Sequence, residues 1–171
     1  MDPLQEHTIA FTGLKEGLHA FTFELGREFF DAAGEEEFEG GAVHVEVALD
    51  KHSTMLVANI HVDGPVNVRC DHCNEPMELV LKGDQRQIFK LTDEEDLDDD
   101  ELVALGSNAH DVNLTHYIYE CLRLSLPARH VHAPGLCDPE VERVLGELTV
   151  EHEPLPDPRW EVLDKLKKQQ P

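Results

Sequence analysis

The fold is decided by a stretch in the middle of the chain, Val43-His44-Val45-Glu46-Val47-Ala48-Leu49. Large apolar side chains occupy every second position, and this period of two predicts a β-strand with one buried face. A second run of the same kind spans Thr54 to Val62, and we expect Gly64-Pro65 to end it. Strands so close in sequence favour antiparallel pairing, because parallel strands require longer crossover connections.

The same alternation predicts further strands before and after this pair in the sequence. Two strands between His7 and Leu25 and a short helix over Arg27–Ala33 are expected before it. After it, alternation leads into Cys70 and resumes from Met77 to Leu81 and from Gln87 to Leu91. These runs predict a sheet of about six or seven strands.

The second half of the chain has the 3.6-residue period of amphipathic helices. Asn113 can cap a helix that Pro127 ends, and Asp138 followed by Pro139 begins another. The apolar stripes are Leu114, Tyr117, Ile118, Cys121 and Leu122 in the first helix, and Val141, Val144, Leu145 and Leu148 in the second. We therefore predict an α+β fold: an antiparallel β-sheet or partly open β-barrel with two or three helices in the C-terminal half. Cys121 is expected to pack in the core.

The chain has the size and apolar content of one domain, with 171 residues of which 40% are hydrophobic. We expect residues 1–153 to form this α+β domain, and residues 154–171 to form a Pro-rich linker and a short helix beginning near Asp157. Within the domain, residues 93–101 contain eight acidic residues in nine. Such a run predicts either a solvated loop or a clamp for a basic partner.

The charge balance narrows the range of partners. With 14 basic and 36 acidic side chains, the formal net charge is −22. This charge excludes a simple basic groove for nucleic acid and argues against binding an anionic membrane surface, whereas basic proteins and metal ions suit it. The sequence shows neither an apolar run long enough to span a membrane nor a secretory leader. We expect a cytoplasmic protein whose thiols stay reduced.

Three of the four cysteines, Cys70, Cys73 and Cys137, are best explained as metal ligands. Cys70-Asp71-His72-Cys73 is a Cys-x-x-Cys turn at the end of a predicted strand, and two thiolates at this spacing can grip one ion. A closed tetrahedral site needs a second pair, and His132 and Cys137 supply one between the two predicted helices. His130 is a substitute for His132, and His72 is a weaker one. One structural zinc ion per chain would then join the β region to the helical region.

Other interpretations of these residues stay open. The thiols can be reduced and metal-free, can form a disulfide, or can be a redox pair, although such pairs usually open a helix. His44 and Glu46 followed by the Cys-x-x-Cys turn superficially match zinc deaminases, but Arg69 rather than proline precedes Cys70. No catalytic-triad order, phosphate-binding glycine loop or His-Glu-x-x-His motif is present. We expect no catalytic residue and no small-molecule substrate.

Several segments, taken together, resemble one protein family. They are the strand into Cys70-x-x-Cys73, the acidic run, the helix end Leu124-Ser125-Leu126-Pro127, the His132 and Cys137 segment, and the tail from Asp157-Pro158-Arg159-Trp160 to Leu166. Their order is similar to the bacterial YceD family from about residue 10 to residue 168. Position by position, the resemblance implies the metal ligands Cys70, Cys73, His132 and Cys137. Many relatives have two or more cysteines in the second cluster, so His130 stays open as an alternative to His132.

The resemblance also implies a function in ribosome biogenesis, namely accumulation of large-subunit (23S) ribosomal RNA or assembly of the 50S subunit. The family's gene often neighbours that of a small basic large-subunit ribosomal protein, which agrees with the acidic charge. The implied protein is a non-enzymatic factor that binds a basic ribosomal protein and contacts rRNA only indirectly. The alternatives are a zinc-dependent hydrolase or deaminase-like enzyme and a direct rRNA-binding module.

Overall fold

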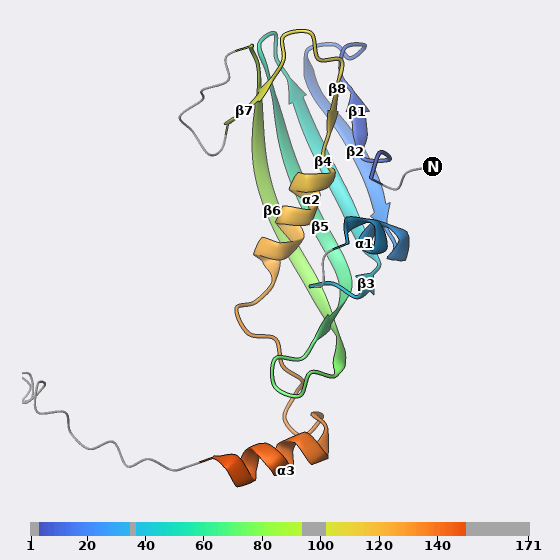
Figure 1. Ribbon diagram of the computed structural model, residues 1–171. Helices are drawn as coiled ribbons and strands as arrows, with labels where there is room; N and C mark the ends of the chain where they lie inside the picture. The colour runs from blue at the N-terminus through green and yellow to red at the C-terminus, as the bar shows by residue number, and fades with distance from the viewer. Residues whose placement is uncertain (1–3, 35–36, 94–101, 150–171) are drawn as a thin grey trace, which may run out of the picture. The chain divides into compact units, whose positions relative to one another are not determined.

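The computed structural model describes residues 4–34, 37–93 and 102–149 (Figure 1). The chain divides into two compact units, Met1–Cys137 and Asp138–Pro171, each considered by itself. The predicted domain boundary at residues 153 and 154, the helix expected beyond it, and most of the acidic run 93–101 lie outside the described residues. Those expectations stay predictions.

The first unit is built on a six-stranded sheet with the order β2-β4-β5-β6-β7, in which β3 also pairs with β5. Its strands are β2 (Gly17–Leu25), β3 (Gly40–Gly41), β4 (Val43–Lys51), β5 (Met55–Arg69), β6 (Pro76–Leu91) and β7 (Leu102–Leu105). Neighbouring strands are antiparallel except β6 and β7, which are parallel. The short strands β1 (Thr8–Ala10) and β8 (Asp111–Asn113) form a separate antiparallel pair.

The alternation of β4 decides which face of the sheet is buried. Its four large apolar residues from Val43 to Leu49 are at most 1% exposed, whereas Glu46 between them is exposed. Val47 pairs with Ile60 of β5, which is buried as well. A slip of one residue would turn this whole apolar set toward solvent, so the pattern fixes the register of the sheet.

β5 is longer than expected, and the prediction that Gly64-Pro65 ends it is wrong. The strand passes through both residues and stays paired with β6 as far as Arg69. Gly64 has φ +153°, and a Cβ there would lie 2.5 Å from the Ala42 carbonyl oxygen, so glycine is needed where another backbone crosses closely. The Pro65 carbonyl accepts a hydrogen bond from the Ala42 amide at 2.9 Å. β6 is likewise one strand where two were expected.

The helices are α1 (Arg27–Ala33), α2 (Thr115–Ser125) and α3 (Pro139–Leu148). α2 lies against β5 and β6 in Figure 1. Ile118, Cys121 and Leu122 of α2 are at most 2% exposed, so the core position predicted for Cys121 is confirmed. Burial raises the pKa of the Cys121 thiol to about 11. Gly83 of β6 makes room for the end of α2, because a Cβ there would lie 1.7 Å from Ser125 Oγ.

The predicted α+β class is confirmed. The main sheet is open rather than closed into a barrel, and α2 and α3 lie in the C-terminal half of the chain, with α1 where the sequence placed a short helix. The parallel pairing of β6 with β7 is a departure from a fully antiparallel sheet. Among the described residues, no helix has both the length and the apolar composition that crossing a membrane requires.

Candidate metal centre

The first half of the centre is the turn that joins β5 to β6. Cys70 follows the last residue of β5, and the chain reverses before β6 begins at Pro76. The Asn74 amide donates to the Cys70 carbonyl and the Cys70 amide donates to the Glu75 carbonyl, both at 2.9 Å. Asn74 has φ +60°, a left-handed conformation that asparagine tolerates better than most residues. This turn brings the thiols of Cys70 and Cys73 close together.

The second half comes from the segment that follows α2. Residues 133–136 form a tight turn in which the Leu136 amide donates to the Ala133 carbonyl at 3.0 Å. Gly135 has φ +82°, and a left-handed glycine directly after a proline is typical of a type II turn. His132 and Cys137 stand on either side of this turn, which directs their side chains to the same place.

The four donor atoms meet in one cluster. Cys73 Sγ lies 3.4 Å from His132 Nδ1, and Cys137 Sγ lies 3.9 Å from the same nitrogen. Cys70 Sγ lies 3.9 Å from Cys137 Sγ, and all four atoms are within 4.8 Å of one another. In a tetrahedral zinc site, bonds of about 2.3 Å to sulfur and about 2.0 Å to nitrogen put two sulfurs about 3.8 Å apart and sulfur and nitrogen about 3.5 Å apart. The donor set fits a zinc ion held by three thiolates and one imidazole.

The His132 ring is oriented for coordination through Nδ1. Its Nε2 lies 3.3 Å from the Pro76 carbonyl oxygen, and since a carbonyl can only accept, Nε2 must carry the hydrogen. The neutral ring then has its lone pair on Nδ1, which faces the three thiols. A hydrogen bond from the second ring nitrogen to a backbone carbonyl is the usual support of a metal-binding histidine.

His130 lies beside the cluster and has a different contact. Its amide donates to Asp71 Oδ2 at 2.8 Å, and the Asp71 amide donates to the His130 carbonyl at 2.9 Å. His130 Nε2 is 3.5 Å from Asp71 Oδ1. We call this reciprocal contact the Asp71–His130 clip. It joins the two halves of the centre, and the structure thus places His132 within the cluster and His130 in the clip.

The thiols and the imidazole of the cluster differ in their affinity for protons. Burial opposes ionisation of Cys70, but hydrogen bonds from neighbouring backbone N–H groups outweigh it and lower the pKa of this thiol to about 5. Desolvation, with the neighbouring thiols, raises the pKa of Cys137 to about 12. A hydrogen bond to Cys73 raises the pKa of His132. A divalent cation that binds here must therefore displace protons, so its affinity depends on pH.

The other candidate residues are not part of the four-donor cluster. His72, in the β5–β6 turn, lies beside it: its amide donates to Cys70 Sγ at 3.4 Å, and its ring nitrogen is within 4.8 Å of Cys137 Sγ. His44 and Glu46 lie on β4, where His44 Nδ1 is 2.6 Å from Glu24 Oε1. Among the described residues, the partners of the Cys-x-x-Cys pair are thus His132 and Cys137 rather than a His-x-Glu pair. The clip and the Pro76 carbonyl were not foreseen, because backbone partners leave no sequence motif.

Comparison with known proteins identifies the family. No curated protein and no solved structure matches the chain. The family model described as "Large ribosomal RNA subunit accumulation protein YceD" matches residues 58–167. The match covers well over half of the chain and includes all four donors of the cluster, so the resemblance noted from the sequence motifs is confirmed. The chain therefore belongs to the YceD family, which is named for accumulation of the large ribosomal RNA subunit.

Proposed function

We propose that this chain is a non-enzymatic factor of ribosome biogenesis in the bacterial cytoplasm. It promotes accumulation of 23S rRNA, or assembly of the 50S subunit, by binding a basic large-subunit ribosomal protein. The observation that carries the proposal is a net charge of −22 on a member of a family named for large ribosomal RNA accumulation. Such a chain can shield a cationic protein until rRNA, with its dense negative charge, displaces the chain from that protein.

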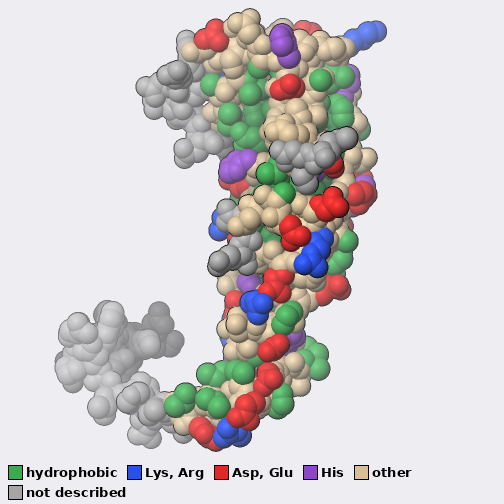
Figure 2. All heavy atoms as spheres, turned by 45° about the vertical axis from the view of Figure 1, so that its right-hand side comes forward, with side chains coloured by type: hydrophobic (Ala, Val, Ile, Leu, Met, Phe, Trp, Pro, Cys, Tyr) green, Lys and Arg blue, Asp and Glu red, His purple; other side chains and the backbone are tan. Residues whose placement is uncertain are grey.

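The distribution of charge supports a protein partner over bare RNA. Acidic side chains are spread over the face in Figure 2, while Lys and Arg occur at fewer places. Some basic side chains are already in ion pairs: Lys82 lies 3.0 Å from Asp63, and Arg123 lies 2.6 Å from Glu37. RNA binding depends on cations that contact phosphates and release counterions. Paired cations on an acidic surface suit that task poorly.

The donor cluster supports a structural role for zinc rather than a catalytic one. Cys70, Cys73, His132 and Cys137 lie close enough to supply all four ligands of a tetrahedral ion, whereas catalytic zinc sites keep one position open for water or substrate. A bound zinc ion would cross-link the β5–β6 turn to the segment after α2. Closing so long a loop of chain favours the folded state. We therefore assign the centre one structural zinc ion per chain and no reaction.

The partner is tested by binding experiments with the full-length, zinc-loaded chain. The probes are individually purified basic proteins of the large subunit and, separately, protein-free 23S rRNA. We expect one or a few of the proteins to bind, with an affinity that falls at least about tenfold between about 50 mM and about 300 mM salt, because salt screens surface charge. The rRNA should not bind the chain directly, and it should release a bound protein.

Two results would contradict the proposal. Binding to protein-free rRNA that is tighter than binding to any of the basic proteins would assign the chain to the RNA-binding modules. Protein binding that does not respond to salt would remove the role given to the acidic surface. Zinc content is measured on the same preparation, so the metal assignment is judged separately from the partner.

A further inference from the structure

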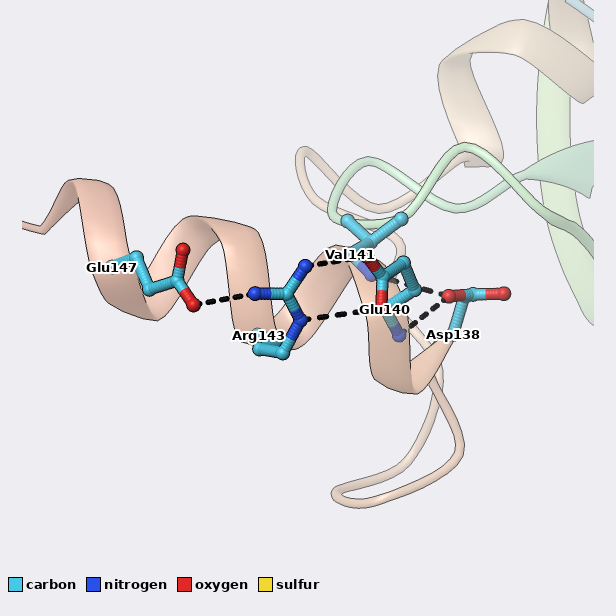
Figure 3. A network of polar contacts seen from close by, with 5 residues as sticks. All are labelled: Asp138, Glu140, Val141, Arg143 and Glu147. Carbon is cyan, nitrogen blue, oxygen red and sulfur yellow. Dashed lines mark hydrogen bonds and ion pairs between the residues drawn. The ribbon is translucent and has the colours of Figure 1, made fainter.

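α3 is a short helix whose first turn and polar side are stabilised by hydrogen bonds and ion pairs (Figure 3). Asp138 caps it, since its Oδ1 accepts hydrogen bonds from the amides of Glu140 at 2.8 Å and Val141 at 3.1 Å. On the polar side, Arg143 lies between two carboxylates, 2.6 Å from Glu140 and 2.5 Å from Glu147. These contacts fix where the helix begins and which side faces water.

The opposite side of α3 is an apolar stripe without a cover. It consists of Val141, Val144, Leu145 and Leu148, at the spacing of one helix face. Leu148 is 70% exposed, Val144 is 39% exposed and Leu145 is 38% exposed. Within residues 138–149, the described part of this unit, no side chain of α3 is buried. A helix of 10 residues is marginal in water without packing, which indicates that another segment covers the stripe.

We propose that the chain's own C-terminal segment, Trp160 to Leu166, packs on the apolar stripe of α3. Trp160, Leu163 and Leu166 recur at every third residue, so they can share one face. Residues 149–159 connect the two parts, and such a linker can extend over roughly 36 Å. α3 itself is only about 15 Å long, so the segment can return along it. The family match, which ends at residue 167, includes both parts.

The charges of the two parts are complementary. From Asp138 to Leu148 there are four acidic side chains and one basic side chain, and two of the four carboxylates are already paired with Arg143. The segment from residue 159 to residue 168 has four basic and two acidic side chains; the basic ones are Arg159, Lys165, Lys167 and Lys168. Docking therefore brings a net basic segment against a net acidic helix, as well as apolar residues onto the stripe.

The tethered segment is favoured over an external occupant by its effective concentration. A short linker holds it near α3 at the equivalent of about millimolar concentration. A second copy of the chain would bring two acidic helices and two net charges of −22 together. This inference goes beyond the proposed function, and it depends on neither the zinc ion nor the ribosomal partner.

The test uses the fluorescence of Trp160, which is the single tryptophan of the chain. In the full-length protein we expect a blue-shifted emission and weak quenching by acrylamide, because the indole is shielded from water. Leu145→Glu puts a charge into the stripe and should shift the emission to the red and raise the quenching constant several-fold. Leu163→Ser, which leaves α3 unchanged, should have the same direction of effect.

The matched control is Gly146→Glu. It introduces the same charge one residue along, on the polar side of α3, where an added Cβ meets no atom within 4 Å. Its emission should stay as in the unmodified protein. A fully exposed Trp160 in the unmodified chain, or an emission that Leu145→Glu leaves unchanged, would overturn the proposal. A shielded Trp160 that becomes exposed on dilution, as sedimentation shows a dimer dissociating, would assign the stripe to a second copy instead.

Discussion

Two regions of the first unit hold the chain after β8 against the β5–β6 hairpin, and they do so in different ways. α2 packs through side chains such as Ile118 and Leu122, which are fully buried. The segment after α2 is held through His132 and Cys137, which are only half-buried. Apolar packing works by removing surface from water and needs no ion. The donor cluster gathers groups that compete for protons, so it needs a cation to become a stable contact.

Two histidines show the same contrast. His7 lies among aromatic rings, with centroids 5.2 Å from Phe23 and 5.1 Å from Phe29, and burial lowers its pKa. A hydrogen bond to Cys73 raises the pKa of His132. The apolar region thus excludes a positive charge and the cluster attracts one. The pKa of a histidine is therefore shifted in opposite directions in the two regions.

The largest expected effect comes from removing one donor. Cys137→Ser should reduce the zinc content from one ion per chain to nearly none, because apparent binding free energies of structural zinc are on the order of 10 kcal/mol and depend on all four ligands. Zinc is measured by elemental analysis of the folded protein. Cys121→Ala is the control, since it removes a thiol that lies in the core, and it should keep its zinc. Full zinc content in Cys137→Ser would contradict the assignment of Cys137 as a zinc ligand.

The next effect is on the apolar region. Leu122→Ala should lower the free energy of unfolding by about 2–5 kcal/mol, because it leaves a cavity under α2. Urea titration followed by circular dichroism measures this loss. Zinc content of the folded fraction should not change. Loss of zinc from the folded fraction of Leu122→Ala would show that the two regions are not independent.

The Asp71–His130 clip is expected to act on the cluster alone. Asp71→Ala removes the acceptor of the His130 amide and should weaken zinc binding about 10–100-fold, the usual effect of losing a support behind metal ligands. Competition with a chromophoric chelator measures the affinity. Asp71→Asn keeps an acceptor oxygen and should bind zinc nearly as well as the unmodified protein. Equal zinc affinities of the Ala and Asn variants would show that the Asp71–His130 clip does not support zinc binding.

The smallest effect is the pH dependence that His7 contributes. Because the pKa of His7 is lowered in the folded state, its contribution is present above the unfolded pKa of about 6.5 and is lost as the pH falls below that value. His7→Phe should make the fall in unfolding free energy below about pH 6.5 shallower. Denaturant titrations at several pH values measure the slope. An unchanged slope would mean that His7 takes up its proton without strain.

His44→Gln is the matched comparison for His7. A hydrogen bond to Glu24 raises the pKa of His44 in the folded state, so this group contributes stability at low pH and loses it as the pH rises. Its removal should make the acid loss steeper, opposite in sign to His7→Phe. The same sign of change for both variants would contradict the assignment of either shift.

Local patterns made most elements predictable. The period-two alternation of Val43 to Leu49 fixes both the strand and its buried face, and the start of α3 follows from Asp138 and Pro139. The prediction that Gly64-Pro65 ends a strand was wrong, because the same two residues can also allow another backbone to cross a continuous strand. The Ala42 carbonyl that requires the glycine is visible only in the folded chain.

From the sequence alone, the α+β class, the buried faces of the strands and the two candidate ligand segments could be predicted, with His130 left open as an alternative to His132, because hydrophobic period and the spacing within each ligand segment are local properties. Only the tertiary structure decided that His132 turns its Nδ1 toward the thiols while His130 lies in the clip with Asp71. The two histidines stand two residues apart in a segment without regular structure. Which ring enters the cluster depends on the Pro76 carbonyl and on Asp71, both more than 50 residues earlier in the chain.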